Sequence, residues 1–417
     1  MQTESQIEFI ESLPKLLNGK KIIVGVCGSV AIYKTLEVIR ILQKLGASVR
    51  VVMSASAQEF IKPLLFEAIS HFQVLTQESQ SWGSNPCNHI ELANFGDVFL
   101  IAPTSANTLN KLANGISDNV LLESFLAFDK TKILAPAANT KMLENPATQE
   151  SLSILQKRGV QIVLPECKEL ACGVVGNGAL ANPLEIVFCT LRALLQTPFW
   201  EQCEVCVSGG GSREALDSVR YLSNFSSGKM GASLALAAYC LGAKVCFVSS
   251  QIPYPLPLGI EIQRVESSNE FLESILKWQN HKPTPKKQSF LFMSAAMSDY
   301  VPIQKVRGKL KKQEIGKVWN LQLQENKDIL ASLEKKQKTI GFKLESSALE
   351  TSVQNAQNAL KAKNLDAVCL NTITDSSNPL ESQHNQIFWI RDSFKVDLGF
   401  SDKFSLSFKI LQEAQNL

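Results

Sequence analysis

Lys21-Ile-Ile-Val-Gly-Val-Cys27 is a short apolar run that ends in a glycine-serine turn, Gly28-Ser29. Helical periodicity follows from about Ala31 to Leu45, and a second apolar run, Ser48-Val-Arg-Val-Val-Met53, comes directly after it. Strand, helix and strand at this spacing predict a βαβ unit with parallel strands. The chain therefore begins as an α/β sheet covered by helices.

The same alternation continues through the first half of the chain. Further strands are predicted at Asp97-Val-Phe-Leu-Ile-Ala102, Thr131-Lys-Ile-Leu-Ala-Pro136 and Val160-Gln-Ile-Val-Leu164. Between Leu191 and Glu201 the pattern ends in a helix and a turn that contains Pro198. We expect a domain boundary there, with a first domain over residues 1–195 and a second over 196–417.

The second half repeats the design from Cys203-Glu-Val-Cys-Val-Ser208 onward. Strands are expected at Lys244–Ser249, Phe290–Ser294, Thr339–Phe342 and Leu365–Leu370, with a helix from about Met230 to Leu241. The sequence thus predicts an α/β protein of two doubly wound parallel-sheet domains, of the Rossmann or flavodoxin-like kind. In such sheets, ligands bind at the carboxyl ends of the strands.

The composition is that of a soluble globular protein, with 45% hydrophobic and 19% charged residues. A net charge of +3 is too small to suggest nucleic-acid binding. The first residues carry glutamates where a leader peptide would be basic and apolar, and no run of about 18 apolar residues occurs. We expect a cytoplasmic protein that acts on small molecules and binds no nucleic acid or membrane.

The ten cysteines of such a chain should be mostly reduced. Cys206, Cys246 and Cys369 lie in apolar, strand-like runs and are expected in the core. Cys203 and Cys206 have the C-x-x-C spacing, but no second pair or histidine follows nearby, which disfavours a metal or redox role. The four histidines are scattered and predict no metal cluster.

Residues 206–231 place a glycine turn, a charged loop and a second glycine-bearing loop behind one apolar strand. Backbone N–H groups at glycine, followed by a helix start near Met230, favour a phosphate-sized anion. Side chains that bind anions crowd the same turn, namely Arg213, Arg220, Asn224, Ser226, Ser227 and Lys229. We interpret this segment as a nucleotide site; a glycine-rich loop without a ligand is the alternative.

Small polar residues also follow the strands of the first half, at Gly28-Ser29, Ser54 and Ala102-Pro-Thr-Ser-Ala-Asn-Thr108. Each alone is more typical of a helix cap than of a phosphate site. Together with Asn88-His-Ile-Glu-Leu92, Ala135-Pro-Ala-Ala-Asn-Thr-Lys-Met142 and the loop 170–178, they resemble the flavin-dependent cysteine decarboxylases. With residues 206–231 included, the chain resembles the bifunctional phosphopantothenoylcysteine decarboxylase / phosphopantothenate–cysteine ligase family of coenzyme A biosynthesis.

For the first domain, this resemblance implies that His89 is the base, that Asn139 binds the substrate carboxylate and that Cys172 donates a proton. It implies FMN as the cofactor, bound by Gly28, Ser29, Ser54, Ser105, Asn107 and Thr108. Loss of CO₂ needs an adjacent electron sink, which a flavin can supply. A histidine at a helix start and a cysteine before glycine are also common structural features, so an ordinary role for each residue stays open.

For the second domain, the resemblance implies that Asn224 contacts an acyl-cytidylate and that Lys309 neutralises charge on the activated phosphate. It implies that CTP is bound by Ser294, Ala295, Asp299, Lys309, Asn326, Asp328, Ile329, Phe342 and Lys363, with Mg²⁺ as the metal and no ligands assigned to it. Lys309 belongs to the basic run 305–312, and such a run is more often a solvated face.

Several positions depart from the family pattern. Ala138 stands where methionine is usual, and Ala179-Leu180 replace an arginine-methionine pair, which should loosen the flap over the substrate. Lys327 replaces a proline, and Ala359 replaces a lysine about one turn before Lys363. One phosphate contact is therefore either missing or supplied elsewhere.

The sequence predicts a bifunctional enzyme that ligates 4'-phosphopantothenate to cysteine with CTP and decarboxylates the product to 4'-phosphopantetheine. Two alternatives remain, a decarboxylase with an inactive ligase domain and a non-catalytic regulatory flavoprotein. The non-catalytic alternative is disfavoured by the joint presence of His89, Asn139 and Cys172. The resemblance also implies a homo-oligomer, with trimeric decarboxylase contacts and dimeric ligase contacts that would close as a dodecamer.

Overall fold

The structure is a computed structural model that describes residues 9–10, 12–83, 87–170, 173–280, 288–311, 313, 316–373, 382–392 and 394–417. These residues form two compact units. One unit spans Lys15–Leu195, and the other spans Gln196–Leu417 together with the described residues before Lys15. In the second unit, Phe9 is buried and its ring stacks on Tyr254 with the centroids 4.4 Å apart.

The first unit is built on a five-stranded parallel sheet in the order β2-β1-β3-β4-β5. Its apolar strands are buried on both faces, as expected for a parallel sheet between helices. The strands are β1 (Lys21–Val26), β2 (Ser48–Met53), β3 (Val98–Thr104), β4 (Thr131–Pro136) and β5 (Gln161–Ile162). The predicted strand positions and the parallel α/β sheet are confirmed.

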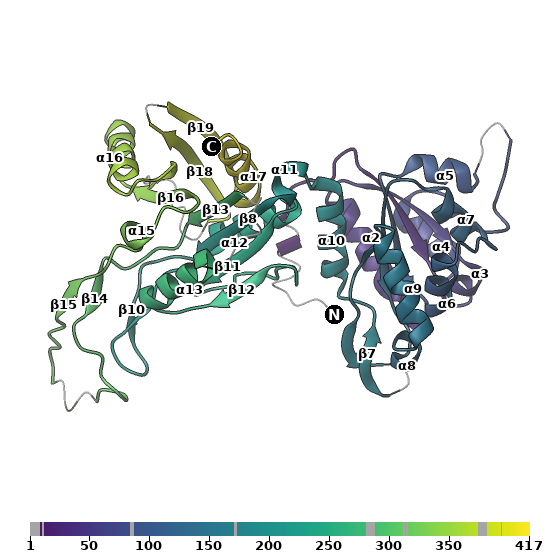
Figure 1. Cartoon of the computed structure of the whole chain (residues 1–417), viewed down its shortest axis with the longest axis horizontal. Helices are drawn as coiled ribbons and strands as arrows, with labels where there is room; N and C mark the ends of the chain where they lie inside the picture. Colours follow the sequence, from purple (N-terminus) through teal and green to yellow (C-terminus); the bar gives the residue numbers. More distant parts are fainter. Residues whose placement is uncertain are drawn as a thin grey trace. The chain divides into compact units, whose positions relative to one another are not determined.

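Helices cover both faces of this sheet (Figure 1). On one face, α2 (Tyr33–Lys44) packs against α10 (Pro183–Leu195) and α4 (Pro63–Ser70). On the other face, four helices share a core with Ile23, Phe99 and Leu134 of the strands. They are α5 (His89–Phe95), α6 (Ala106–Ala113), α7 (Val120–Ala127) and α9 (Pro146–Lys157). Shorter helices are η1 (Val30–Ile32), α3 (Ala55–Gln58) and α8 (Thr140–Leu143).

The second unit contains an eight-stranded sheet in the order β12-β11-β8-β13-β16-β17-β18-β19. Its members are β12 (Glu261–Arg264), β11 (Lys244–Ser249), β8 (Cys203–Gly209), β13 (Gln288–Met293), β16 (Lys338–Glu345), β17 (Ala367–Thr372), β18 (His384–Arg391) and β19 (Phe394–Asp402). The first six are parallel, as predicted. The pairs β17–β18 and β18–β19 are antiparallel, so the sheet is mixed at one edge, which the strand-helix alternation did not indicate.

Two layers of helices enclose the second sheet. Helices α12 (Lys229–Cys240) and α17 (Lys403–Ala414) pack against each other, and α12 also packs on β8 and β11. Helices α13 (Ser268–Asn280), α15 (Ile329–Ser332) and α16 (Leu349–Ala362) contribute to the two cores on the other face. Helix α11 (Pro198–Glu201) precedes β8.

Three two-stranded ribbons lie outside the main sheets. They are β6 (Glu166–Glu169) with β7 (Val175–Ala179), β9 (Glu214–Ala215) with β10 (Tyr221–Leu222), and β14 (Tyr300–Pro302) with β15 (Leu323–Glu325). Figure 1 shows β14 and β15 on an arm that extends from the second sheet. All three pairs are antiparallel, and the sequence pattern predicted none of them.

The cysteines agree with the predicted core. Cys206, Cys246 and Cys369 are buried in their strands, and the nine described cysteines are free thiols. Cys203 is also buried and donates to the carbonyl oxygen of Phe199, so the C-x-x-C pair belongs to the packing of β8. Among the described residues, no helix has the length and apolar character needed to cross a membrane.

Candidate functional site

Three serines follow parallel strands of the first unit, and each caps a helix. Ser29 accepts from the backbone N–H of Ala31, Ser54 from that of Ala57, and Ser105 from that of Thr108, at 3.2–3.3 Å. Because the ends of β1, β2 and β3 are adjacent, these caps share one edge of the sheet. A role as helix cap and a role in phosphate binding are therefore compatible for these serines, since a capping hydroxyl can still donate its proton to a ligand.

The loop after β1 is held closely to its neighbours. A Cβ at Gly28 would lie 2.9 Å from the carbonyl oxygen of Ser56, so only glycine fits there. Behind the loop, the Cys27 thiol donates to the Thr108 hydroxyl at 3.2 Å, and burial raises the pKa of Cys27. Asn107 is exposed on α6. The tight glycine turn lets a phosphate group approach closely, and the uncharged donors around it can form hydrogen bonds to the phosphate oxygens.

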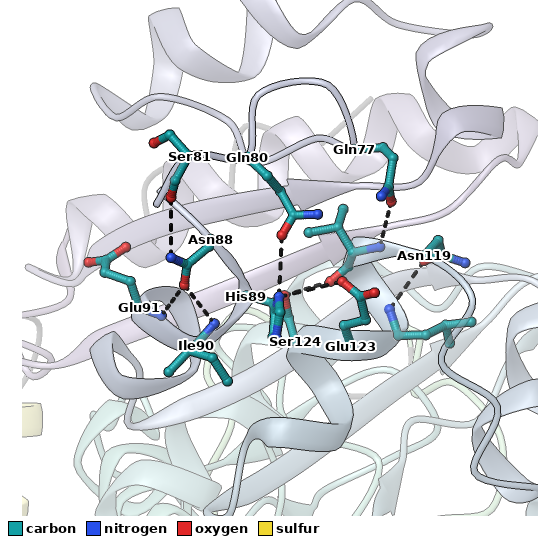
Figure 2. A network of polar contacts seen from close by, with 12 residues as sticks. Gln77, Gln80, Ser81, Asn88, His89, Ile90, Glu91, Asn119, Glu123 and Ser124 are labelled. Carbon is teal, nitrogen blue, oxygen red and sulfur yellow. Dashed lines mark hydrogen bonds and ion pairs between the residues drawn. The ribbon is translucent and has the colours of Figure 1, made fainter. Parts of the chain in front are cut away.

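His89 is the first residue of α5 and lies in a polar network with α7 (Figure 2). Its Nδ1 atom lies 3.3 Å from Oε1 of Gln80 and 3.5 Å from Oε2 of Glu123. Trp82 packs edge-on against the imidazole, with the ring centroids 5.6 Å apart. Two acceptors at Nδ1 favour a proton on that nitrogen, which leaves Nε2 as the basic nitrogen.

The helix starts on either side of this network are fixed by asparagine caps. Asn88 accepts from the backbone N–H groups of Ile90 and Glu91 and donates to the carbonyl oxygen of Ser81 (Figure 2). Asn119 caps α7 in the same way. These caps hold the starts of α5 and α7, and with them His89 and Glu123. The sequence indicated His89 but not Glu123 or Gln80.

Asn139 caps α8 at the end of β4 and accepts from the backbone N–H of Lys141. The ribbon strand β7 lies directly against this loop. A Cβ at Gly176 would overlap the Thr140 hydroxyl, and one at Gly178 would overlap the carbonyl oxygen of Ala138. The N–H of Ala138 donates to the carbonyl oxygen of Gly178 at 3.1 Å. The two glycines therefore allow the β6–β7 ribbon to contact the Asn139 loop.

Cys172 lies outside the described residues, so the structure gives no position for it. The residues that replace the arginine-methionine pair are ordered: Ala179 pairs with Glu166 at the end of the ribbon, and the carbonyl oxygen of Leu180 accepts from Lys34 Nζ at 3.3 Å. His89 contacts Gln80 and Glu123 of α7, and the loop of Asn139 contacts β7 through Ala138 and Gly178.

The second unit contains a cavity of about 750 Å³ at the carboxyl ends of its parallel strands. It is lined by eight of the residues that the resemblance assigned to CTP, namely Ser294, Ala295, Asp299, Asn326, Asp328, Ile329, Phe342 and Lys363. Ser226, Ser227 and the start of α12 form another part of the wall. Residues from distant parts of the sequence are thus brought together as expected.

Hydrogen bonds between neighbouring strand ends shape this cavity. Ser294 donates to the carbonyl oxygen of Ser208, and the Ser208 hydroxyl accepts from the N–H of Ala295. A Cβ at Gly231 would lie 2.7 Å from that same carbonyl oxygen, so glycine lets the first turn of α12 reach the strand ends. Asn326 donates to the carbonyl oxygen of Ser298, which holds the segment before α15 against the wall.

Lys363 forms an ion pair with Asp328 at 2.9 Å on the cavity wall. Burial alone would raise the pKa of Asp328, but hydrogen bonds from Lys363 and from the N–H of Ala331 lower it. Asp328 is therefore ionised at neutral pH and holds Lys363 near the site. Ala359 lies one turn before Lys363 on α16.

Asn224 and Lys309 are not in the cavity wall. Asn224 is exposed and donates to the carbonyl oxygen of Met297, which does line the cavity. Lys309 is exposed on its loop, which Asp217 anchors by accepting from the N–H groups of Leu310, Val219 and Arg220. The described basic residues of the run, Lys305, Arg307, Lys309 and Lys311, are thus exposed, as on a solvated face.

Two arginines of the glycine-rich segment make other contacts. Arg220 pairs with Asp217 at 3.0 Å, and Arg213 lies over the ring of Tyr221.

Four further residues line the cavity but were not predicted from the sequence, namely Lys343, Lys403, Asn371 and Asn385. Asn385 lies on β18 and Lys403 begins α17, and no local motif marks them. Within the described part of the chain, no three His, Cys, Asp or Glu side chains cluster as metal ligands.

The comparisons with known proteins cover both units. Residues 10–195 match the Flavoprotein family, and residues 200–417 match the family described as DNA/pantothenate metabolism flavoprotein C-terminal domain. The coenzyme A biosynthesis bifunctional protein CoaBC of Vibrio parahaemolyticus is 35% identical, over 96% of this chain and 99% of its own. That of Bacillus subtilis is 33% identical, over 95% and 97%.

The chain belongs to the CoaBC family. It is therefore a bifunctional enzyme of coenzyme A biosynthesis, with a phosphopantothenoylcysteine decarboxylase and a phosphopantothenate–cysteine ligase. The predicted function is confirmed, and nothing in these comparisons supports the two alternatives.

Solved structures match each unit separately. A PPC decarboxylase mutant complexed with pantothenoylaminoethenethiol is 37% identical, with a TM-score of 0.39, over 42% of this chain and 96% of its own. A C-terminal domain of CoaBC is 27% identical, with a TM-score of 0.41, over 51% and 94%. An FMN-binding protein, AtHal3, is 37% identical, with a TM-score of 0.38, over 42% and 95%. The first unit is a flavoprotein domain.

Proposed function

We propose that the second domain, residues 196–417, joins 4'-phosphopantothenate to cysteine through an acyl-cytidylate made from CTP in the presence of Mg²⁺. The first domain, residues 1–195, then decarboxylates phosphopantothenoylcysteine to 4'-phosphopantetheine with FMN as its cofactor. The two reactions share one phosphorylated intermediate, which the ligase makes and the decarboxylase consumes.

The observation that carries the ligase proposal is the cavity of the second unit. Eight of the nine residues expected to contact CTP line it, although they come from four separate segments of the sequence. Half-buried Phe342 and buried Ile329 offer apolar contact for a base, while Asp299 and Asn326 offer hydrogen bonds. A nucleotide needs both kinds of contact at once.

Lys309 and Asn224 take separate roles in this proposal. Charge develops at the α-phosphate and on pyrophosphate when the carboxylate attacks CTP, and the Lys309 ammonium offsets that charge. Asn224 bonds to the carbonyl of Met297 at the cavity wall, so its amide is close to the strand-end loop where the acyl group would lie. It holds the acyl-cytidylate for attack by the amine of cysteine.

In the decarboxylase, Nε2 of His89 is the proposed base and Asn139 the proposed ligand of the substrate carboxylate. Cys172 is the proposed proton donor. The caps of Ser29, Ser54 and Ser105, with Gly28, Asn107 and Thr108, would hold the FMN phosphate. FMN, when bound, supplies the hydride acceptor that loss of CO₂ requires.

The ligase half-reactions test the two roles. Pyrophosphate release with cysteine omitted reports activation alone, and it should fall about a hundredfold in Lys309→Gln. Asn224→Asp should still release pyrophosphate but form less phosphopantothenoylcysteine, because the new carboxylate repels the intermediate's phosphate. Parental pyrophosphate release by Lys309→Gln, or parental product formation by Asn224→Asp, would refute this division of roles.

The decarboxylase site is proposed to be completed by neighbouring subunits in a homo-oligomer. Apolar residues beside the expected site residues are exposed in the single chain: Val30 next to Ser29 is 58% exposed, Ile90 next to His89 is 45% exposed, and Met142 is 52% exposed. Such apolar residues around polar ones suit a subunit contact. Native mass spectrometry should give multiples of three chains and a bound FMN; a colourless monomer would contradict this.

A further inference from the structure

Glu123 is a half-buried carboxylate beside the imidazole of His89. Its side chain is 31% exposed, and that of His89 is 21% exposed. The carboxylate oxygen Oε2 lies 3.5 Å from Nδ1 of His89, and Figure 2 shows Glu123 and Gln80 both directed at the ring. This oxygen is shielded from solvent and has no hydrogen-bond partner among the described residues. A carboxylate oxygen in such a place loses its contacts with water without receiving a donor in return.

The two neighbours of Nδ1 affect the imidazole in different ways. Gln80 forms a hydrogen bond with Nδ1 through Oε1 at 3.3 Å, and because an amide oxygen only accepts, Nδ1 carries the proton. Glu123 makes no hydrogen bond to the ring, but its Oε2 lies close enough for the negative charge to act on it. Such a charge has little effect on a neutral imidazole and a large effect on an imidazolium. Gln80 therefore fixes the tautomer, and Glu123 supplies the charge.

The other charged residues of the elements around His89 have different neighbours. Glu91, the acidic residue of α5, pairs with Arg50 at 2.6 Å. Lys21 of β1, on which α5 packs, lies over the phenylalanine ring that ends α5. Glu123 is the single charged residue of α7. Within α5, α7 and β1, Glu123 is therefore the carboxylate placed to balance a positive charge on His89.

The polarity of the two helices gives this balance a purpose. His89 is the first residue of α5, where the partial positive charge of the helix start disfavours an imidazolium. Glu123 lies in the first turn of α7, where the same partial charge favours the presence of a carboxylate. The packing of α5 on α7 thus brings an acid at a favourable helix start next to a base at an unfavourable one.

Resting on the proposed decarboxylase reaction, we propose that Glu123 is a positioning residue that stabilises the imidazolium formed when His89 acts as the base. In the proposed oxidation, a hydride leaves the substrate carbon for FMN, the thiol on that carbon gives its proton to Nε2 of His89, and a C=S bond forms. Nδ1 keeps its own proton, so the ring is cationic until Nε2 releases the proton it received. Glu123 offsets this charge and acts through His89, not on the substrate itself.

The test measures CO₂ release by the full-length, FMN-containing parent and by Glu123→Gln, which keeps the shape of the side chain and removes its charge. The kcat should fall about tenfold with KM and FMN content near the parental values, because the charge acts on the protonated base and not on substrate binding. The acidic limb of the pH dependence of kcat/KM should move to lower pH, since an imidazole without a neighbouring carboxylate takes up a proton less readily.

Two further variants control for the loss of charge. Glu123→Asp keeps the carboxylate and should regain part of the kcat that Glu123→Gln loses. Glu150→Gln removes the same charge from an exposed position on α9 and should match the parent in kcat, KM and pH dependence. A purely structural role of Glu123 would lower the FMN content or raise KM and would leave the acidic limb in place.

Adding Glu123→Gln to His89→Asn shows whether Glu123 acts through the base. His89→Asn alone should release CO₂ at least about a hundredfold more slowly, and the second substitution should lower the residual rate no further. A tenfold loss that persists in the His89→Asn background, or parental kcat and pH dependence in Glu123→Gln beside a defective His89→Asn, would overturn the role of Glu123 and leave the proposed base standing. Parental CO₂ release by His89→Asn would instead refute the proposed base itself.

Discussion

The two units equip the same edge of a similar parallel sheet with different chemistry. In the first unit, Ser29, Ser54 and Ser105 end the strands with hydroxyl groups that cap the following helices. In the second unit, Lys229 and Lys403 begin two helices at a cavity of about 750 Å³. One edge offers neutral hydrogen bonds, and the other offers positive charge.

The difference agrees with the reaction that we propose for each site. A cofactor phosphate keeps the same charge throughout catalysis, so fixed neutral donors are enough to hold it. A triphosphate that is cleaved develops negative charge on its leaving group, and nearby cations offset that charge directly. Two sheets of similar topology thus acquire separate reactions through the residues at their strand ends.

The two sites also differ in how much of each site is formed by residues of a single chain. The cavity of the second unit is lined within a single unit by residues of eight separate regions of sequence, from Ser226 to Lys403. In the first unit the expected site residues are flanked by exposed Val30, Ile90 and Met142. The proposed ligase site is therefore largely internal, whereas the proposed decarboxylase site has exposed apolar neighbours that a further subunit would cover.

The largest effect is expected for the base of the first unit. His89→Asn should lower CO₂ release by at least about a hundredfold, because general-base catalysis at Nε2 is lost. FMN should remain bound, since the caps at the strand ends are untouched, and pyrophosphate release by the second unit should stay at the parental rate. CO₂ release and flavin absorbance on the same preparation check this.

A matched control exists for this substitution. His71 ends α4 in a left-handed conformation with φ of 63°, which asparagine adopts readily, so His71→Asn should leave both activities intact. If His89→Asn contains flavin and releases CO₂ at the parental rate, His89 is not the base. The comparison of the two sheet edges would then have no base assigned in the first unit.

A smaller loss is expected when the ribbon of the first unit is displaced. An alanine Cβ at Gly178 would overlap the carbonyl oxygen of Ala138, so Gly178→Ala should push β7 away from the Asn139 loop. The decarboxylase kcat/KM should fall about tenfold, mostly through KM, if this loop holds the substrate carboxylate. Gly83→Ala, where a Cβ meets no atom within 4 Å, is the control. Equal kinetics for the two variants would contradict a role of the ribbon.

The parts of the fold that follow local periodicity were predictable. The runs Ser48–Met53 and Thr131–Pro136 coincide with β2 and β4 because buried parallel strands are continuously apolar. The antiparallel edge, β18 and β19, was not predicted: its strand β19 has Leu398 as its one buried residue and no helix before it. Its position depends on pairing with β17, which no short window of sequence contains.

The same limit applies to the candidate sites. His89 and Asn139 were indicated because the motifs Asn88–Leu92 and Ala135–Met142 resemble those of a known family. Lys403 was not, because it enters the cavity from the last helix, carried there by β19. Glu123 was not, because its proximity to His89 comes from the packing of α7 on α5. Residues brought by tertiary packing leave no local pattern.

An effect of similar size or smaller is expected at the lysine loop of the second unit. Asp217 accepts from three backbone N–H groups and from Arg220, and one of these donors is Leu310, the neighbour of Lys309. Asp217→Asn weakens these charge-assisted bonds and should lower pyrophosphate release about threefold to tenfold. CO₂ release from added phosphopantothenoylcysteine should not change. Asp392→Asn, in the turn between β18 and β19, is the control, and equal rates for both variants would contradict anchoring by Asp217.

The smallest effect concerns the pH dependence of stability in the second unit. Burial and the charge of Lys229 lower the pKa of Lys403 to about 8 in the folded chain, whereas an unfolded lysine titrates near ~10.4. Below about pH 8, Lys403 is protonated in both the folded and the unfolded state, and its buried positive charge lowers the free energy of unfolding by the full amount. Between these two values the unfolded state binds more protons than the folded state, so the free energy of unfolding gains a contribution as pH rises.

Lys403→Met lacks this contribution, while every other titrating group is shared with the parent. The midpoint of unfolding of the variant should therefore exceed that of the parent most at pH 7, and the excess should shrink by about 2 °C or more by pH 10. Scanning calorimetry of both chains without nucleotide, following the transition of the second unit, measures the difference. An excess that stays constant from pH 7 to pH 10 would mean that the pKa of Lys403 is not lowered by its surroundings, and the contrast between a neutral first edge and a cationic second edge would then lose one of its physical observations.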